Sequence, residues 1–422
     1  MKYQRKEGLA WRKLDDYAKL FPLASTKKYK TVFRISVLLK DKIDSEILEK
    51  AVKLALNKFK YFKVRMRKGI FWYYFENNPK APIIEEENDY PCKFIDLPLN
   101  NDYLFKVTYF ENKINLEIFH CLTDGSSATH FLKEITYNYI EMKYMKNTST
   151  ALTQERKVKY TTEDIYRKNY NKKIHAQRDR KKAYNLKGTL LPPGVVSVTH
   201  EFMSSNKVRE VAKSKNATVT QFLTATLIYA IHEAGVKKDG SKREVKIQVP
   251  VNLKKYFPSA TSSNSFSYID VNVDTNKEQN FDNILEEVKK QFAEKLTEEE
   301  LLNTIAVNLR LANNWFLKFV TLFIKKFVVS KAHKEVRKFN TTTLSNVGRI
   351  GIISEYKPYI DKFLLLIAPE SVEKIKCTIC AYEDFMVFSF ASVIEEKDVE
   401  NKLKEILENN GIEVQIEGNE VL

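Results

Sequence analysis

The sequence predicts a mixed α/β protein built from two halves of similar size. At 422 residues the chain is too long for one ordinary hydrophobic core and fits two units of about 200 residues. Both halves alternate short strand-like runs with longer runs of helical periodicity. A polar, basic segment ending in a Pro-Pro-Gly triplet separates them. We therefore expect a first subdomain at residues 1–150, a crossover linker at 151–192 and a second subdomain at 193–422.

The first half contains five strand-like runs and two helical runs. The strand-like runs lie at residues 30–39, 61–67, 70–76, 103–109 and 112–119. The first helix begins after Asp44, a favourable N-cap residue, because apolar side chains recur at helical spacing from Ile47 to Phe59. Helical spacing returns after Gly125, so a strand, a turn and a helix follow one another there.

The second half repeats this alternation with longer helices. Strands are expected at residues 195–202, 245–251, 265–273, 341–348 and 363–368, with a hairpin at 374–393. Helices are expected between the first two of these strands, over residues 279–329 and near 396–408. Each half is therefore predicted to be a mixed sheet flanked by helices.

No apolar run reaches the 18 or so uncharged residues of a membrane-spanning helix. The nearest, residues 315–329, is interrupted by Lys318, Lys325 and Lys326. We expect an amphipathic helix that packs on the rest of the protein. A helix that lies on a membrane surface is the alternative.

The charge of the chain is strongly basic and unevenly distributed. The formal net charge is +16, and residues 155–187 carry twelve Lys or Arg against four Asp or Glu. Such a cluster could bind nucleic acid, an anionic membrane or a phosphorylated ligand, but a solvated linker is the interpretation that we favour. The aromatic residues lie in strand-like runs and not among the basic ones, so we expect no nucleic-acid partner.

The four cysteines are too few for a disulfide framework in so long a chain, which favours a reducing compartment. Cys377 and Cys380 form a C-x-x-C pair inside a strand-like run, without a second Cys or His pair at zinc-ligand spacing. The N-terminal residues carry charges throughout and do not resemble an export signal. We therefore expect a cytoplasmic protein without a bound metal.

The motif with the most chemical content is His120-x-x-x-Asp124-Gly125, directly after the strand-like run at 112–119. A histidine at a strand end has a fixed backbone, a ring that can reach a cleft and a pKa near neutrality, as general acid–base catalysis requires. Gly125 would let the next helix begin close by without a side-chain clash. Asp124 could hold the loop through an ion pair with an arginine, or it could orient His120.

Other reactive side chains are expected to be structural. His130, His200 and His232 lie in helical or strand-like runs, where surface or core positions are usual. Cys121 follows His120 at the strand end and should point to the opposite side, so we reject it as a nucleophile.

At these residues the chain resembles the chloramphenicol-acetyltransferase-like superfamily, which includes alcohol acetyltransferases, plant acyltransferases and the condensation domains of peptide synthetases. Besides the His120 motif, the similar segments are Trp11–Asp15 with Phe21-Pro22, Phe62–Trp72, Ala217-Thr218, Pro250–Lys255 with Phe257-Pro258 and Ser263-Asn264, and Ser345–Gly348. They follow the order in which the family has them.

The resemblance implies two chloramphenicol-acetyltransferase-like subdomains with an active-site tunnel between them. It implies an acyl-CoA-dependent O-acyltransferase in which His120, as general base, takes the proton of a hydroxyl group that attacks the thioester. Asp124 would have a structural role, with Arg65 as its partner in an ion pair. Ser345 and Asn346 are the candidates to donate hydrogen bonds to the oxyanion.

The resemblance also suggests the ligands. Acyl-CoA would be a co-substrate, and no resident cofactor is expected. Within the basic cluster, Lys172, Lys173 and Lys181 are candidates to bind the CoA phosphates. We expect a monomer without stable membrane insertion that acts on a small alcohol or amine.

Two positions depart from the family pattern. Condensation domains carry a second histidine where this chain has Phe119, which argues against peptide synthesis. Lys254 replaces the arginine of the family's P-V-N-L-R segment, so a bidentate contact made by that arginine would be lost. The alternatives are an acyltransferase supplied by an acidic carrier protein, and a non-catalytic protein that binds acyl ligands or nucleic acid.

Overall fold

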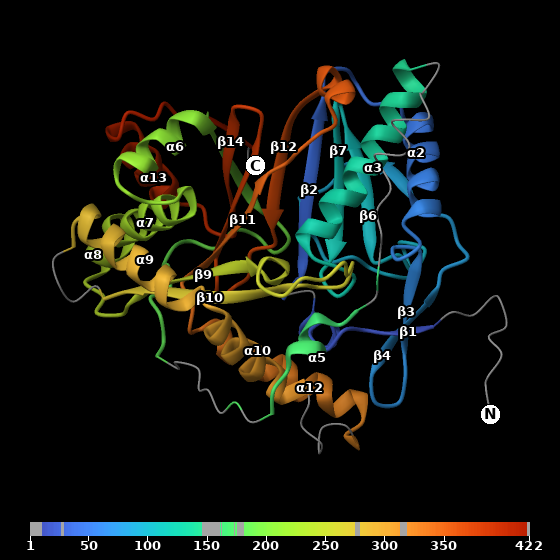
Figure 1. Ribbon diagram of the computed structural model, residues 1–422, viewed down its shortest axis with the longest axis horizontal. Coiled ribbons are helices and arrows are strands. Elements are labelled where there is room, and N and C mark those ends of the chain that lie inside the picture. The colour runs from blue at the N-terminus through green and yellow to red at the C-terminus, as the bar shows by residue number, and fades with distance from the viewer. Residues whose placement is uncertain are drawn as a thin grey trace.

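The computed structural model describes residues 11–26, 29–145, 161, 163–172, 174, 181–274, 279–312 and 319–419. Its strands form three sheets, and the two larger sheets lie side by side between two sets of helices (Figure 1). The predicted architecture, mixed sheets flanked by helices in two halves, is confirmed.

The first large sheet has the strand order β12–β2–β7–β6–β5. Its strands are β2 (Val32–Leu39), β5 (Ile84–Glu86), β6 (Phe105–Phe110), β7 (Lys113–Phe119) and β12 (Ile360–Ile367). Helices α2 (Ser45–Lys58) and α3 (Gly125–Tyr144) pack on it through their apolar faces. Because β12 comes from the second half of the chain and pairs with β2, the two halves share this sheet.

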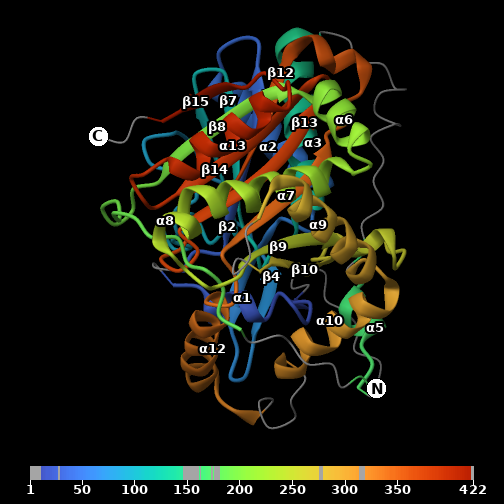
Figure 2. The ribbon, with the colours of Figure 1, turned by 90° about the vertical axis from the view of Figure 1, so that its left-hand side faces the viewer.

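The second large sheet has the order β10–β9–β11–β13–β14–β8–β15, with β11 parallel to both of its neighbours. Its strands are β8 (Ser197–Ser204), β9 (Val245–Asn252), β10 (Phe266–Val273), β11 (Thr342–Arg349), β13 (Ile375–Tyr382), β14 (Phe385–Ser392) and β15 (Gln415–Gly418). Figure 2 shows α6 (Ser205–Ser214), α7 (Val219–Ile231), α9 (Phe281–Lys295) and α13 (Asp398–Asn409) in front of this sheet.

A small third sheet and several helices complete the described chain. The sheet pairs β1 (Arg12–Lys13) and β3 (Val64–Lys68) with β4 (Tyr73–Asn77). The remaining helices are α1 (Leu20–Ala24), α5 (Ile165–Asn169), α8 (Lys237–Asp239), α10 (Glu298–Ala312) and α12 (Leu322–Arg337), together with the short turns η1 (His232–Val236), η2 (Leu253–Lys255) and η3 (Ser354–Tyr359). The helical block predicted for 279–329 is thus divided among α9, α10 and α12.

Local sequence explains where these elements begin. The Asp44 carboxylate accepts from the amides of Glu46 and Ile47 and caps α2 as predicted. Cys377 and Cys380 lie on β13 as buried thiols, and burial raises the pKa of Cys380 to about 12. Among the helices that the structure describes, none has the length and apolar character needed to cross a membrane.

Candidate active site

The turn between β7 and α3 carries the His120 motif, and hydrogen bonds fix its backbone on both sides. The His120 amide donates to the carbonyl of Thr31, at a distance of 2.8 Å. Helix α3 begins at Gly125, and its N-cap Asp124 accepts from the Ser127 amide (N–Oδ1 3.0 Å). The structure therefore places His120 at a strand end, directly before a capped helix.

The imidazole of His120 lies in an aromatic enclosure. It stacks on Phe21 with 4.8 Å between ring centroids, and Phe33 and Phe266 each lie 4.9 Å away. Burial lowers the pKa of His120 below its usual value of 6.5, because the charged ring would lose its hydration. At pH 7 the ring is mostly neutral, which is the state that a proton acceptor needs.

Asn264, on the loop before β10, determines which ring nitrogen of His120 carries the proton. Its Oδ1 lies 3.1 Å from Nδ1 of His120. Its Nδ2 donates to the backbone oxygen of His120 (3.2 Å) and to the Asp15 carboxyl group (3.3 Å), so Oδ1 is the amide atom left to accept. Nδ1 is therefore protonated. Because Nδ1 is taken up by this bond, Nε2 is the nitrogen that can accept a proton.

Asp15 supports Asn264 from the first half of the chain. It is buried and also accepts from the amide of Ala18 (2.6 Å). Burial raises the pKa of Asp15 to about 7. Sequence reasoning gave neither Asp15 nor Asn264 a role, although both lie in segments that resemble the superfamily.

Asp124 binds both the start of α3 and the second half of the chain, and its partner is not the predicted one. Its Oδ2 accepts from the amide (3.0 Å) and the hydroxyl (2.6 Å) of Ser265, which ties the motif loop to the second half. Arg65 instead pairs with Glu76 (Nε–Oε1 2.6 Å), which lies opposite it on β4. The predicted ion pair between Arg65 and Asp124 is therefore wrong, since Arg65 is neutralised within its own hairpin.

Gly125 is not needed for the reason that the sequence suggested. A Cβ atom at this position would meet only Cγ1 of Val347, at an ordinary contact distance of 3.7 Å. The predicted side-chain clash at the start of α3 is therefore wrong. Gly125 lines the cavity beside His120, so the absent side chain leaves room for a ligand instead.

A cavity of about 670 Å³ passes His120 and is lined by both halves of the chain. The first half contributes Phe21, His120 and the beginning of α3, and the second half contributes β9, β10, β11 and the beginning of α7. This volume is in the range of small-molecule sites, and the lining mixes apolar side chains with a few polar groups. His120 is thus accessible to a ligand between the two halves.

The two oxyanion candidates on β11 both line this cavity, but they differ in their hydrogen bonds. Asn346 donates through Nδ2 to the Thr220 hydroxyl (3.0 Å) and accepts through Oδ1 from the Gly348 amide (2.8 Å). These bonds hold the β-bulge at which Gly348 has a φ of +75°. The hydroxyl of Ser345 makes no hydrogen bond to the described part of the chain, so it is the candidate that is free to donate.

Basic side chains gather where α3 and η2 border the cavity. Burial and the nearby charges of Lys133 and Lys254 lower the pKa of His130, which places these three residues together. Lys255 lines the same cavity. We call His130, Lys133, Lys254 and Lys255 the basic mouth. Sequence reasoning missed this group, because its members come from separate segments.

The lysines predicted to contact CoA phosphates lie elsewhere. Lys172 and Lys181 are exposed and are not among the residues that line the cavity. Lys181 lies 3.9 Å from Glu244. Lys173 lies outside the described residues. The assignment of Lys172, Lys173 and Lys181 to the CoA phosphates therefore stays a prediction, and Lys133 and Lys255 are basic residues that do line this cavity.

A buried network of charges forms another part of the cavity wall. Arg337, from the end of α12, pairs with Glu373 (3.0 Å) and Glu370 (3.4 Å). Lys376 pairs with Glu373 and donates to the hydroxyl of Thr343 (2.9 Å). These opposite charges offset one another, so this wall is a rigid polar surface and not a cationic one.

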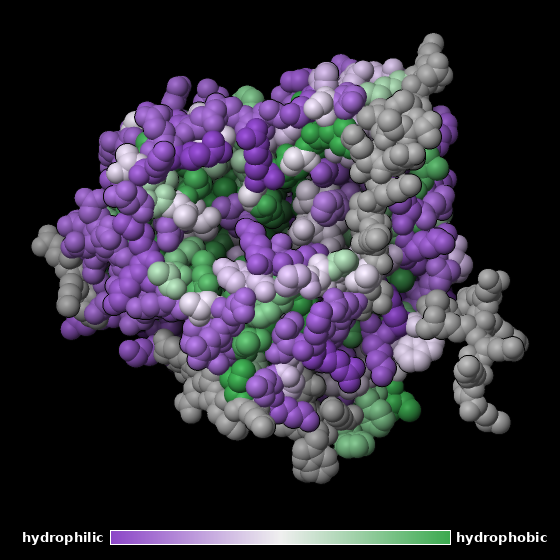
Figure 3. Space-filling model, in the orientation of Figure 1, coloured by the Kyte–Doolittle hydropathy of each residue, from purple (hydrophilic) through white to green (hydrophobic). Residues whose placement is uncertain are grey.

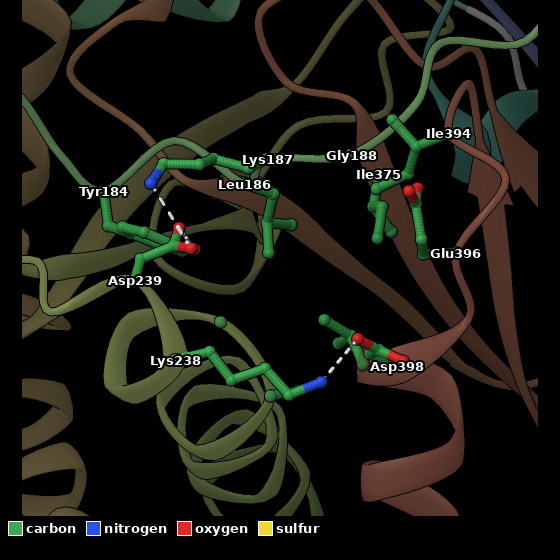
Figure 4. Close-up of a pocket in the computed structure, with 13 residues that line it drawn as sticks. Tyr184, Leu186, Lys187, Gly188, Lys238, Asp239, Ile375, Ile394, Glu396 and Asp398 are labelled. Atoms are coloured by element: carbon green, nitrogen blue, oxygen red, sulfur yellow. Dashed lines mark hydrogen bonds and ion pairs between the residues drawn. The ribbon is translucent and has the colours of Figure 1, made fainter.

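A second, smaller cavity of about 270 Å³ lies in the second half, beside η1 and the start of α13 (Figure 4). Its lysines are paired, Lys187 with Asp239 (3.3 Å) and Lys238 with Asp398 (2.7 Å). Neither His120 nor any other histidine lines it. We therefore place the chemistry in the larger cavity.

Residues 195–363 match the family model described as alcohol acetyltransferase. No curated protein sequence matches the chain.

Solved structures match over nearly the whole chain at low identity. The trichothecene 15-O-acetyltransferase TRI3 of Fusarium sporotrichioides has 10% identity and a TM-score of 0.60, with 97% of this chain and 96% of that chain covered. TRI101 of the same organism, in a complex with coenzyme A and T-2, has 9% identity and a TM-score of 0.62, with 96% and 99% covered. The first condensation domain of the CDA synthetase has 11% identity and a TM-score of 0.61, with 95% and 96% covered.

The chain therefore has the fold that these acetyltransferases and condensation domains share. Within the second half, residues 195–363 are similar to the alcohol acetyltransferases.

Proposed function

We propose that the protein transfers an acyl group from a CoA thioester to a hydroxyl group, with His120 as general base. The observation that carries the proposal is the hydrogen bond between His120 Nδ1 and Asn264 Oδ1, in a ring that lines the cavity between the halves. This bond leaves Nε2 as the nitrogen that accepts a proton.

The proposed reaction needs no covalent enzyme intermediate, because a thioester is already activated. The acceptor hydroxyl gives its proton to Nε2 of His120 while its oxygen attacks the thioester carbonyl carbon. Asn264 accepts from Nδ1 throughout and stabilises the imidazolium. The hydroxyl of Ser345 donates to the oxyanion of the tetrahedral intermediate. Collapse of the intermediate breaks the carbon–sulfur bond, and the leaving thiolate takes the proton from His120.

In this proposal the basic mouth binds the acyl donor, acyl-CoA, through its phosphate groups. CoA carries phosphate groups. His130, Lys133 and Lys255 line the cavity, Lys254 lies near His130, and none of the three lysines has an ion-pair partner among the described residues. Lysine binds phosphate as a point charge, so the replacement of the family's arginine by Lys254 preserves attraction. The acyl chain would then enter the cavity toward His120.

The test follows free thiol release from acetyl-, butyryl- and longer acyl-CoAs with a panel of alcohols and amines. We expect release that depends on an alcohol in the wild-type protein and its loss in His120→Ala. His200→Gln is the matched control, since it alters a partly buried histidine that does not line the cavity. Equal release in the wild type and His120→Ala would contradict the role of His120. Turnover only with an acyl carrier protein would replace CoA as the donor.

A further inference from the structure

Helix α12 exposes apolar side chains and buries a lysine, which is the reverse of the usual pattern for a helix packed on a soluble protein. Its first two turns expose Phe323, Ile324, Phe327 and Val328, with 85% of Phe323 and 70% of Phe327 accessible. The same turns bury Lys325, whose accessible fraction is 1%. The helix is therefore held by Leu322, Lys325 and Val329, while its apolar side chains face outward. The helix predicted over 315–329 does pack on the protein, but the apolar side chains of its first two turns are exposed; residues 315–318 lie outside the described part of the chain.

The turn between β3 and β4 extends this apolar surface. Ile70 is 74% exposed and Phe71 is also exposed. The Leu322 amide donates to the Ile70 carbonyl (3.0 Å), and Lys325 Nζ donates to the Phe71 carbonyl (2.7 Å). Lys325 also lies over the Trp72 ring, 3.8 Å from its centroid. The buried lysine therefore fixes the turn against α12, so that both sets of apolar side chains belong to one rigid surface.

We call Ile70, Phe71, Phe323, Ile324, Phe327 and Val328 the apolar tip. Apolar atoms show at the lower edge of the molecule in Figure 3, where Figure 1 places α12 and the turn between β3 and β4, on a face that is otherwise largely hydrophilic. Contiguous exposed apolar surface of this kind is unusual on a soluble protein and marks an interaction surface.

Lysines border the apolar tip. Lys331 and Lys334 follow Phe327 on the same helix face at spacings of four and seven residues, so the face changes from apolar to basic along the helix. Lys326 and Lys68 are exposed beside it. None of these four lysines has an ion-pair partner within the described residues. Glu335, the acid on this part of α12, pairs with Lys338.

We propose that the apolar tip and these lysines dock the protein on the surface of an anionic lipid bilayer. The apolar side chains would enter the acyl boundary, and the lysines would lie at the level of the headgroups. A second copy of the chain is a poorer occupant, because the lysines around the tip would repel their counterparts. This proposal is independent of the acyl transfer proposed above.

The position of α12 relates the surface to the larger cavity. Arg337, at the other end of the helix, lines that cavity. With a rise of about 1.5 Å per residue, the 13 residues from Ile324 to Arg337 span roughly 20 Å. Docking through the apolar tip would thus hold the cavity about one helix length from the lipid, within reach of an amphiphilic substrate.

The test is flotation with vesicles of phosphatidylcholine alone or mixed with phosphatidylglycerol. We expect the wild type to float with the mixed vesicles, and less so as salt is added. The variant Phe323→Ser/Phe327→Ser should lose most of this binding, and Lys331→Glu/Lys334→Glu should lose the preference for phosphatidylglycerol. The matched control is Phe385→Ser, which removes an exposed phenylalanine from β14.

Two accompanying measurements make the result decisive. Circular dichroism reports whether each variant is folded, whatever its activity, and sedimentation without lipid reports self-association. Absence of flotation for the wild type, or equal flotation of wild type and both double variants, would overturn the proposal. Sedimentation that shows a dimer in the wild type and a monomer in Phe323→Ser/Phe327→Ser, without vesicle binding, would assign the tip to self-association instead.

Discussion

His120 and His200 are partly buried histidines at the two large sheets, and they differ in whether the ring lines the cavity. His200 lies within β8, its Nδ1 is 2.7 Å from the hydroxyl of Ser389, and burial lowers its pKa to about 3. His120 lies just beyond β7, bonds through Nδ1 to Asn264 and lines the cavity. Burial keeps both rings neutral. Access to the cavity is the property that distinguishes the proposed base from a structural histidine.

The largest effect is expected when the two histidines are replaced in parallel. His120→Ala should lower acceptor-dependent thiol release by about a thousandfold, the usual scale for loss of a general base. His200→Gln should leave release within a few-fold of the wild type at pH 7, because it keeps a polar group beside Ser389. The measurement is kcat/KM at pH 7. Comparable losses in both variants would show that His120, like His200, acts through the fold.

Replacing Asn264 tests whether catalysis depends on the His120 tautomer that the Asn264 hydrogen bond stabilises. Asn264→Ala should reduce kcat by about tenfold to a hundredfold, since removing a buried hydrogen-bond partner costs roughly 1–3 kcal/mol. Asn264→Asp should raise the pKa of His120, because a carboxylate beside Nδ1 favours the charged ring. The pH dependence of kcat should therefore shift to higher pH in Asn264→Asp. An unchanged pH profile would argue that Asn264 only supports the loop.

The basic mouth should affect donor binding more than chemistry. Charge reversal at Lys133 or Lys255 is expected to raise the KM for acyl-CoA about fivefold, which corresponds to roughly 1 kcal/mol for a partly exposed ion pair. The matched control is Lys181→Glu, which lies away from the cavity and should leave this KM unchanged. Steady-state kinetics at two salt concentrations make the comparison. A larger rise in KM for Lys181→Glu would indicate that the CoA phosphates bind to the basic linker and not to the basic mouth.

Replacing His200 should change the folding stability of the protein at acid pH and leave its activity unchanged. Its folded pKa of about 3 lies below the unfolded value of 6.5, so below pH 6.5 the unfolded chain takes up a proton that the folded chain excludes. Folding stability should therefore fall by about 1 kcal/mol for each pH unit below 6.5 from this group alone. Denaturant unfolding of the wild type and His200→Gln between pH 5 and 7 should show the shallower slope in the variant. Parallel slopes would contradict the low pKa of His200.

Much of the fold was predictable because strands and helices leave periodic patterns. The strand before His120, the cap of α2 and the hairpin of β13 and β14 were all expected close to their observed positions. The pairing of β12 with β2 was not, because a strand's own sequence does not state which sheet it joins. The exposed face of α12 was hidden for a related reason, since spacing identifies an apolar stripe but not what covers it.

The site residues, too, were in part predictable from the sequence and in part not. His120 was found because one short motif joins a strand, a turn and a helix. Asn264 and Asp15 were not given roles, since 144 residues separate Asn264 from His120 and only the fold brings them together. Arg65 was assigned to Asp124 by family analogy, whereas its strand register gives it to Glu76. Contacts within one element can therefore be predicted from the sequence, whereas contacts between the halves cannot.

The measurement that tests the central claim most directly is the pH profile of acceptor-dependent thiol release, with the wild type and His120→Ala in parallel. Because burial lowers the pKa of His120, the wild-type rate should rise with pH through a pKa below 6.5 and be level at neutral pH. The rate of His120→Ala should be low and lack that limb. The same acid limb in both proteins would contradict the assignment of His120 as the base.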